Sequence, residues 1–124
     1  MKRNELIRMF VLNAMVDDYE SFEQISKEVG RENAHCGITG NRSDILDALT
    51  TLIKDGLVQA YRYSGPPRNE FDKIQGVPPL DEIDNPWFSY FFVTQKGREV
   101  HSATEDWPFD DDRVLRPDWT PPED

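Results

Sequence analysis

His35 and Cys36 stand side by side, and these two residue types bind metals and carry out nucleophilic catalysis. A zinc site needs three or four ligands, yet the chain offers one further histidine, His101, and no second cysteine. A catalytic thiol would also need a base placed beside it. Packing within a loop is the simpler interpretation, so we predict no catalytic residue, no metal site and no cofactor.

Clustered carboxylates are the second group that could do chemistry, either as acid and base or as ligands for a cation. They occur at Asp17-Asp18, Glu105-Asp106 and Asp110-Asp111-Asp112. Calcium loops need alternating ligands with a glycine and a distal glutamate, and no segment has that pattern. Solvated charge is the simpler interpretation. The chain also lacks a glycine-rich phosphate loop and a serine elbow, so we expect it not to be an enzyme.

The charge balance opposes non-specific binding to nucleic acid. The net charge is −10; residues 105–124 hold eight acids and two arginines, a net of −6, which leaves −4 on residues 1–104. Affinity for phosphates depends mainly on lysines and arginines that displace counterions. A single cysteine, no signal-peptide core and no apolar run long enough to span a membrane lead us to expect a cytoplasmic protein.

Three helices are predicted in the first half of the chain. Apolar residues at helical spacing predict the first over residues 4–16. The second begins at Ser21, which forms a capping-box pattern with Gln24, and Gly30 is a plausible end. Residues 31–40 read as a loop or as an irregular extension of this helix. The third begins at Asn41 or Ser43, has a wide apolar face, and ends before Gly56.

Strands and a short helix are predicted in the second half. Residues 57–63 and 87–93 read as strands, and the 23 residues between them, 64–86, contain five prolines and read as a long loop. Thr94 is expected to cap a helix over residues 95–104. Residues 105–124 read as an extended acidic tail.

Two short stretches resemble winged-helix proteins. Residues 48–58, with Ala48-Leu49, Leu52-Ile53 and Gly56-Leu57-Val58, resemble the end of a recognition helix and its turn into the first wing strand. Phe92-Val93-Thr94 with Gly97 resembles the exit from the second wing strand in MarR- and PadR-like regulators. The resemblance covers residues 4–104. It implies an α+β winged helix, a three-helix core with a two- or three-stranded wing, here with a long wing loop and an acidic C-terminal extension.

The resemblance implies that the third helix enters the DNA major groove and that the wing touches the flanking backbone. Basic residues near the helix start and the wing base are then the candidate DNA contacts: Arg31, His35, Arg42, Arg62 and Arg68. Three departures weaken this role. About ten residues separate the second and third helices where a helix-turn-helix uses three or four. The wing loop is acidic, and the outward face of the third helix carries Asp44, Asp47, Thr51, Lys54 and Asp55.

Aromatic residues occupy both faces of the predicted strand 87–93. With a period of two, Trp87, Ser89 and Phe91 share one face, Phe88, Tyr90 and Phe92 share the other, and one of the two faces is expected to be core. Something is therefore expected to cover the second face: the 64–86 loop, the tail or another subunit. In the tail, Trp107, Phe109 and Trp119 either fold back over the wing, which we favour, or reach a partner or sister subunit.

These features predict a non-catalytic regulatory module that acts through protein–protein interaction; the alternative is a DNA-binding transcriptional regulator. The expected interaction surface, suited to a basic partner, comprises Asp44, Asp47, Thr51, Asp55, Trp107, Phe109 and Trp119. A homodimer through the first helix or the tail remains open. A third class, a small-molecule sensor, would need a pocket near Tyr61, Tyr63 and Tyr90.

Overall fold

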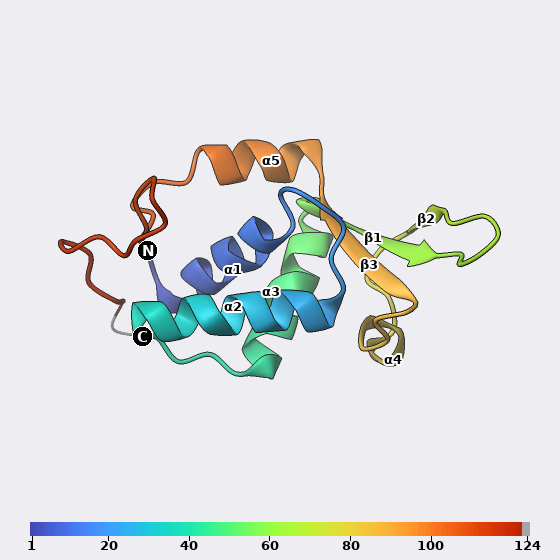
Figure 1. Cartoon of the computed structure of the whole chain (residues 1–124), viewed down its shortest axis with the longest axis horizontal. Coiled ribbons are helices and arrows are strands. Elements are labelled where there is room, and N and C mark those ends of the chain that lie inside the picture. Colours follow the sequence, from blue (N-terminus) through green and yellow to red (C-terminus); the bar gives the residue numbers. More distant parts are fainter. Residues whose placement is uncertain (123–124) are drawn as a thin grey trace.

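A computed structural model describes residues 1–122 and shows an α+β fold with a three-stranded antiparallel sheet. Its elements, in chain order, are α1 (Arg3–Ala14), α2 (Phe22–Cys36), α3 (Arg42–Lys54), β1 (Val58–Tyr63), β2 (Phe71–Ile74), α4 (Leu80–Ile83), β3 (Ser89–Val93) and α5 (Gln95–Ser102). The sheet lies at one end of the helical layer formed by α1, α2 and α3, and the C-terminal segment lies at the other end (Figure 1). No helix in residues 1–122 is long and apolar enough to cross a membrane.

The core forms where α1 packs against α2 and α3. Leu6, Ile7, Phe10 and Val11 repeat at helical spacing on α1, and each is at most 1% exposed. Leu49 and Leu52 of α3 are buried to the same degree. The apolar stripes predicted for the first and third helices are therefore confirmed as core faces.

The second helix does not end at Gly30 but continues to Cys36, so of the two alternatives for residues 31–40 the extension of the helix holds as far as Cys36. Its buried stripe does not stop at Val29 but runs on through Asn33 and Cys36. A glycine inside a helix costs only about 1 kcal/mol, which continued burial can offset. The helix ends instead at Gly37, whose φ of 67° is the left-handed conformation that glycine adopts without strain. Residues 37–41 alone link α2 to α3, so the expected ten-residue connection is wrong.

The third helix begins and ends as predicted. Asn41 accepts a hydrogen bond from the backbone N–H of Asp44 at 2.9 Å, and the Asp44 carboxylate accepts one from the Asn41 N–H at 2.9 Å. Gly56 follows with a φ of 77°, and the Leu57 N–H donates to the Leu52 carbonyl at 2.9 Å. This closed turn directs the chain straight into β1.

The sheet has the order β2-β1-β3, and its register decides which side chains share a face. Ala60 of β1 stands opposite Ile74 of β2 and Phe91 of β3, and this face covers the helical core. The prediction of a long structureless loop over residues 64–86 is wrong: it contains β2, which pairs with β1, and α4, whose Ile83 is 1% exposed.

The C-terminal segment, residues 105–122, packs on α1 and not over the wing. The Trp107 ring meets Phe10 edge-to-face with centroids 5.5 Å apart, and Phe109 lies 6.4 Å from the same ring. The expectation that these aromatic residues fold back is confirmed, but their target is the helical layer (Figure 1). The last two residues of the predicted tail, Glu123 and Asp124, lie outside the described residues.

Candidate interaction surface

Six aromatic rings gather on the face of the sheet that points away from the core. We call this group the aromatic sheet face; it comprises Tyr19, Tyr61, Tyr63, Phe71, Tyr90 and Phe92. It contains all four tyrosines of the chain. Tyr19 comes from the α1–α2 connection, and the other five come from the three strands. A concentration of one side-chain type on one face marks this surface out from the rest of the molecule.

The strand register explains why these rings meet. Tyr63 stands opposite Phe71, with centroids 5.1 Å apart, and Tyr61 stands opposite Tyr90. Tyr19 then stacks on Phe71 at 4.3 Å with the ring planes only 10° apart. Offset and edge-to-face contacts of this kind add about 0.5–1.5 kcal/mol each beyond area burial. The cluster is thus a stiff, mutually supported platform.

The aromatic sheet face remains accessible to solvent. Phe71 is 36% exposed, and the other rings are half-buried. Burial raises the pKa of the Tyr61 hydroxyl, with further contributions from the charge and hydrogen bonding of Tyr19, so the Tyr61 phenol is protonated at neutral pH. The predicted cover for this face is present in part, because Phe71 belongs to the 64–86 segment.

Sequence reasoning missed Tyr19 and Phe71. Phe71 sits in a four-residue strand with two charged neighbours, and Tyr19 is a lone aromatic residue in an acidic connection. Neither position has a periodic signal of its own. Only the pairing of β2 with β1 brings Phe71 beside Tyr63.

Charges around the aromatic sheet face are mostly acidic. Asp18 and Glu20 flank Tyr19 in sequence, and Glu70 precedes Phe71. Burial raises the pKa of the Glu20 carboxyl, and repulsion from Glu28 and Asp18 raises it further. Two cations lie near the rings: Lys73 stands opposite Tyr61 in the β1–β2 register, and the guanidinium of Arg98 lies 5.7 Å from the centroid of Phe92. The acids of this rim favour a further cation approaching the rings.

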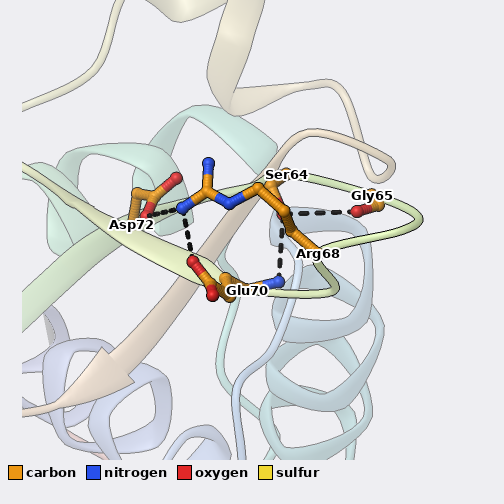
Figure 2. Close-up of polar contacts among 5 residues, drawn as sticks. All are labelled: Ser64, Gly65, Arg68, Glu70 and Asp72. Atoms are coloured by element: carbon orange, nitrogen blue, oxygen red, sulfur yellow. Dashed lines mark hydrogen bonds and ion pairs between the residues drawn. The ribbon is translucent and has the colours of Figure 1, made fainter.

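Arg68, one of the predicted DNA contacts, is paired with acids of its own β1–β2 hairpin. Its guanidinium pairs with Glu70 and with Asp72 at 3.5 Å, while Ser64 accepts a hydrogen bond from the Glu70 N–H at 3.0 Å (Figure 2). The two carboxylates raise the pKa of the arginine and neutralise its charge. A phosphate would have to compete with both of them.

Arg42 and Arg62 are occupied in a similar way by the short helix α4. Arg42 pairs with Asp84, and Arg62 pairs with both carboxylate oxygens of Glu82 at 3.1 and 3.2 Å. Each guanidinium also lies over an aromatic ring, Phe22 for Arg42 and Phe88 for Arg62. Glu82 of α4 and Asp84 just after it therefore supply acids to Arg62 of β1 and to Arg42 at the start of α3.

The five predicted DNA contacts do not converge. Arg31 and His35 lie on the side of α2 that faces the C-terminal segment, where both line a hollow with Trp107 and Phe109. The other three are bound to acids of the wing. Arg42 and Arg62 share one feature: their acidic partners, Asp84 and Glu82, lie two residues apart at the end of α4.

The predicted acidic face of α3 is less acidic than its sequence indicates. Asp44 is engaged in the capping box and lies 3.4 Å from the guanidinium of Arg3. Asp47 and Thr51 line a hollow between α1 and α3 together with Arg3 and Arg8. Asp55 is the residue at the helix end, and its carbonyl accepts a hydrogen bond from Lys96. Arg3 and Arg8 of α1 therefore place positive charge beside the acids of α3.

The tryptophans do not all lie where the sequence suggests. Trp87, which the predicted alternation places on the same face as Phe91, lies in the turn before β3 and is 83% exposed. Trp107 and Trp119, predicted as interaction anchors together with Phe109, are half-buried and pack against the core. Trp87 escapes burial because β3 begins only at Ser89, so the alternation of the strand does not extend to it.

Cys36 is unsuited to nucleophilic chemistry. It is 3% exposed at the end of α2, and burial, assisted by the charge of Glu32, raises its pKa to about 11. The thiolate is therefore scarce at neutral pH. Within residues 1–122 no group of three or more His, Cys, Asp or Glu side chains could hold a metal ion.

Comparison of the chain with protein-family models, curated proteins and solved structures finds no match. The surface chemistry of the chain therefore has to carry the inference of function. The aromatic sheet face is the most distinctive surface, and Trp87 is the most exposed large apolar side chain among the described residues.

Proposed function

We propose that this protein is a non-catalytic winged-helix module that acts in regulation by binding another protein. The observation that carries the proposal is the aromatic sheet face, which holds all four tyrosines on the solvent side of the wing. Tyrosine and tryptophan are enriched at the energetic centres of protein interfaces. Trp87 offers a further anchor of this type.

The order of the elements supports the winged-helix part of the proposal. Three helices precede an antiparallel sheet of β1, β2 and β3, and the Gly56 turn leads from α3 directly into β1. The short α2–α3 connection over residues 37–41 supports it as well. In this interpretation β1, β2 and β3 form the wing, and the aromatic sheet face is its outer surface.

The partner is expected to present arginine or lysine side chains. The chain carries a net charge of −10, and Asp18 and Glu20 flank Tyr19 of the aromatic sheet face in the sequence. A guanidinium can stack on a tyrosine ring and meet a neighbouring carboxylate at once, so arginine fits better than lysine. Attraction between opposite charges would speed the encounter and hold the register of the complex.

The alternative function, DNA-binding transcriptional regulation, has weaker support. It would require Arg42, Arg62 and Arg68 to leave their carboxylate partners and turn to phosphates. When an arginine leaves, its carboxylate partner is exposed at the same place and repels the phosphate backbone of the DNA. The separation of Arg31 and His35 from these residues further reduces the expected contact area.

A titration with matched peptides tests the proposal. Isotope-labelled protein is titrated with peptides of equal length that alternate glycine with arginine, lysine or glutamate, and with a mixed-sequence DNA duplex at low salt. We expect saturable shifts of the tyrosine ring signals with the arginine peptide, smaller shifts with lysine and none with glutamate or DNA. Phe71→Ser should weaken arginine-peptide binding about fivefold or more.

Val114→Ser is the control, because Val114 is 59% exposed in the C-terminal segment. It should leave peptide binding unchanged. Steeply salt-sensitive binding to the duplex would favour the DNA-binding alternative. Concentration-dependent sedimentation that Phe71→Ser abolishes would assign the aromatic sheet face to a second copy of the chain and overturn the assignment to a different partner.

A further inference from the structure

A hollow of about 450 Å³ separates α2 from the C-terminal segment. One wall is a stripe of side chains three and four residues apart on α2, which places them on a single helical face: Glu28, Arg31, Glu32 and His35. The opposite wall is formed by Trp107, Phe109, Asp110 and Arg113, and Asp17 also lines the hollow. This hollow lies apart from the aromatic sheet face and is independent of its proposed use.

The charged groups of this hollow are unpaired, unlike those of the wing. Within the described part of the chain, Glu28, Arg31 and Arg113 have no ion-pair partner within 4.0 Å. In the wing, by contrast, Arg62 and Arg68 are each bound to carboxylates. Charges of both signs thus line one cavity without neutralising each other in direct contacts.

Glu28 lies near charged residues from both walls of the hollow. Burial raises the pKa of its carboxyl, although Arg31 and Arg113 act to lower it; Glu32 and Asp17 raise it further. The carboxylate is thus partly desolvated, and its two neighbouring guanidiniums do not compensate fully. A cationic group of a ligand placed beside Glu28 would supply the missing stabilisation.

The apolar wall of the hollow consists of aromatic rings that pack on Phe10 and His101. Trp107 packs on Phe10 at 5.5 Å and on His101 at 6.2 Å, and Phe109 lies 6.4 Å from Trp107. Asn13, at the inner end of the hollow, is fixed by a contact of 2.9 Å between its side-chain oxygen and Nε2 of His101. The apolar wall is therefore preformed, which lowers the entropic cost of binding.

We propose that this hollow binds a free apolar α-amino acid. Arg31 or Arg113 donates hydrogen bonds to the ligand carboxylate, Glu28 accepts from its ammonium group, and the side chain lies against Trp107 and Phe109. The cavity falls in the size range of small-molecule sites and has room for one such ligand. A ligand with only a positive charge would leave the arginines of the hollow unpaired, and one with only a negative charge would leave Glu28 unpaired. A ligand without an apolar body would leave the rings uncovered.

Four probes separate these requirements in an NMR titration that follows the amides of α2. L-phenylalanine carries both charges and an apolar body; phenethylamine lacks the carboxylate, 3-phenylpropionate lacks the ammonium group, and glycine lacks the apolar side chain. We expect saturable shifts with L-phenylalanine. Binding of each other probe should be about tenfold weaker or more, because each loses one class of contact.

Variants test the assigned roles without removing the packed rings. Arg31→Gln and Glu28→Gln should each weaken L-phenylalanine binding about fivefold or more. Arg68→Gln and Glu70→Gln are the matched controls in the wing, and they should leave binding unchanged. The absence of saturable shifts up to the solubility of L-phenylalanine would overturn the site. Equal affinity for phenethylamine or 3-phenylpropionate would overturn the zwitterion, and full binding by both α2 variants would overturn the assigned contacts.

Discussion

The molecule places aromatic residues in two regions and uses them in opposite ways. At one end, Trp107 and Phe109 of the C-terminal segment pack on Phe10 of the core. At the other end, where the sheet lies (Figure 1), the rings of the aromatic sheet face pack mainly on one another, and Phe71 is 36% exposed. The first group is bound to the interior, whereas the second is a surface without a partner among the described residues.

The difference shows that aromatic density in a sequence does not decide which residues form an interface. Prolines and acids surround Trp107 and Phe109, a context that suggests an exposed tail, yet α1 provides a core surface for them. The strand 89–93 suggests core on both faces, yet only its inner face meets the helices. What matters is whether another element reaches the ring, and the packing of elements decides this.

Phe10→Ala should have the largest effect and most directly tests the anchoring of the C-terminal segment. Phe10 is 1% exposed and meets both Trp107 and Phe109, so its loss leaves a cavity and frees two rings. We expect the free energy of unfolding to fall by about 3–5 kcal/mol in urea denaturation. Limited proteolysis should then cut within residues 105–122. A loss below about 1 kcal/mol would show that the segment is not part of the core.

The two tryptophans Trp107 and Trp87 form a matched pair for the next test. Trp107→Ala should lower the free energy of unfolding by about 2–3 kcal/mol, because the half-buried ring packs on the core. Trp87→Ala should change it by less than about 0.5 kcal/mol, because Trp87 is 83% exposed. Urea denaturation of both variants checks the order, and acrylamide should quench Trp87 fluorescence preferentially. Equal losses would remove the contrast between the two regions.

The sequence predicted the local parts of the fold because their signals lie within a few residues. The Asn41 cap, the Gly56 turn and the Thr94 cap, which accepts a hydrogen bond from the Gly97 N–H at 3.0 Å, are all present as expected. Gly97 has an additional role that sequence could not reveal. A Cβ at this position would lie 2.0 Å from the Leu57 carbonyl oxygen, so α5 approaches β1 in a way that requires glycine.

The candidate site depends on long-range pairing and was therefore predicted only in part. Tyr61, Tyr63 and Tyr90 were singled out as a group, but as the lining of a pocket. Phe71 joined them only once β2 was seen to pair with β1. The neutralisation of Arg42 and Arg62 by α4 was equally hidden, since 20 residues separate Arg62 from Glu82. Spacing within one element cannot show contacts between elements.

Tyr90→Ser tests whether the aromatic sheet face contributes less to stability than the packed C-terminal rings do. Tyr90 meets Phe71 at 5.3 Å and Tyr63 at 6.0 Å, so its loss removes two ring contacts but opens no enclosed cavity. We expect the free energy of unfolding to fall by about 1 kcal/mol, less than for Trp107→Ala. The same variant should weaken arginine-peptide binding about fivefold or more. A stability loss as large as that of Phe10→Ala would mean that the aromatic sheet face is core and not an interface.

His101 gives a small, pH-dependent effect and tests how tightly the C-terminal segment is packed. Burial lowers the pKa of this imidazole, the nearby charge of Arg98 lowers it further, and Asp17 opposes them. Because the unfolded chain binds the proton more readily, the stability due to neutral His101 is fully present above about pH 6.5 and is lost as the pH falls toward the lowered folded pKa. The imidazole is partly solvated, so the loss should stay below about 1 kcal/mol.

His101→Gln should remove this contribution, so the stability of the variant relative to the parent chain should rise as the pH falls from 7.5 to 5.5. NMR titration of the imidazole signals gives the pKa directly. In the Trp107→Ala variant, solvent reaches His101 more easily, and its pKa should move back toward the ordinary value. An unchanged pKa in that variant would mean that the indole does not shield the imidazole. The packed end of the molecule would then be looser than its ring contacts indicate.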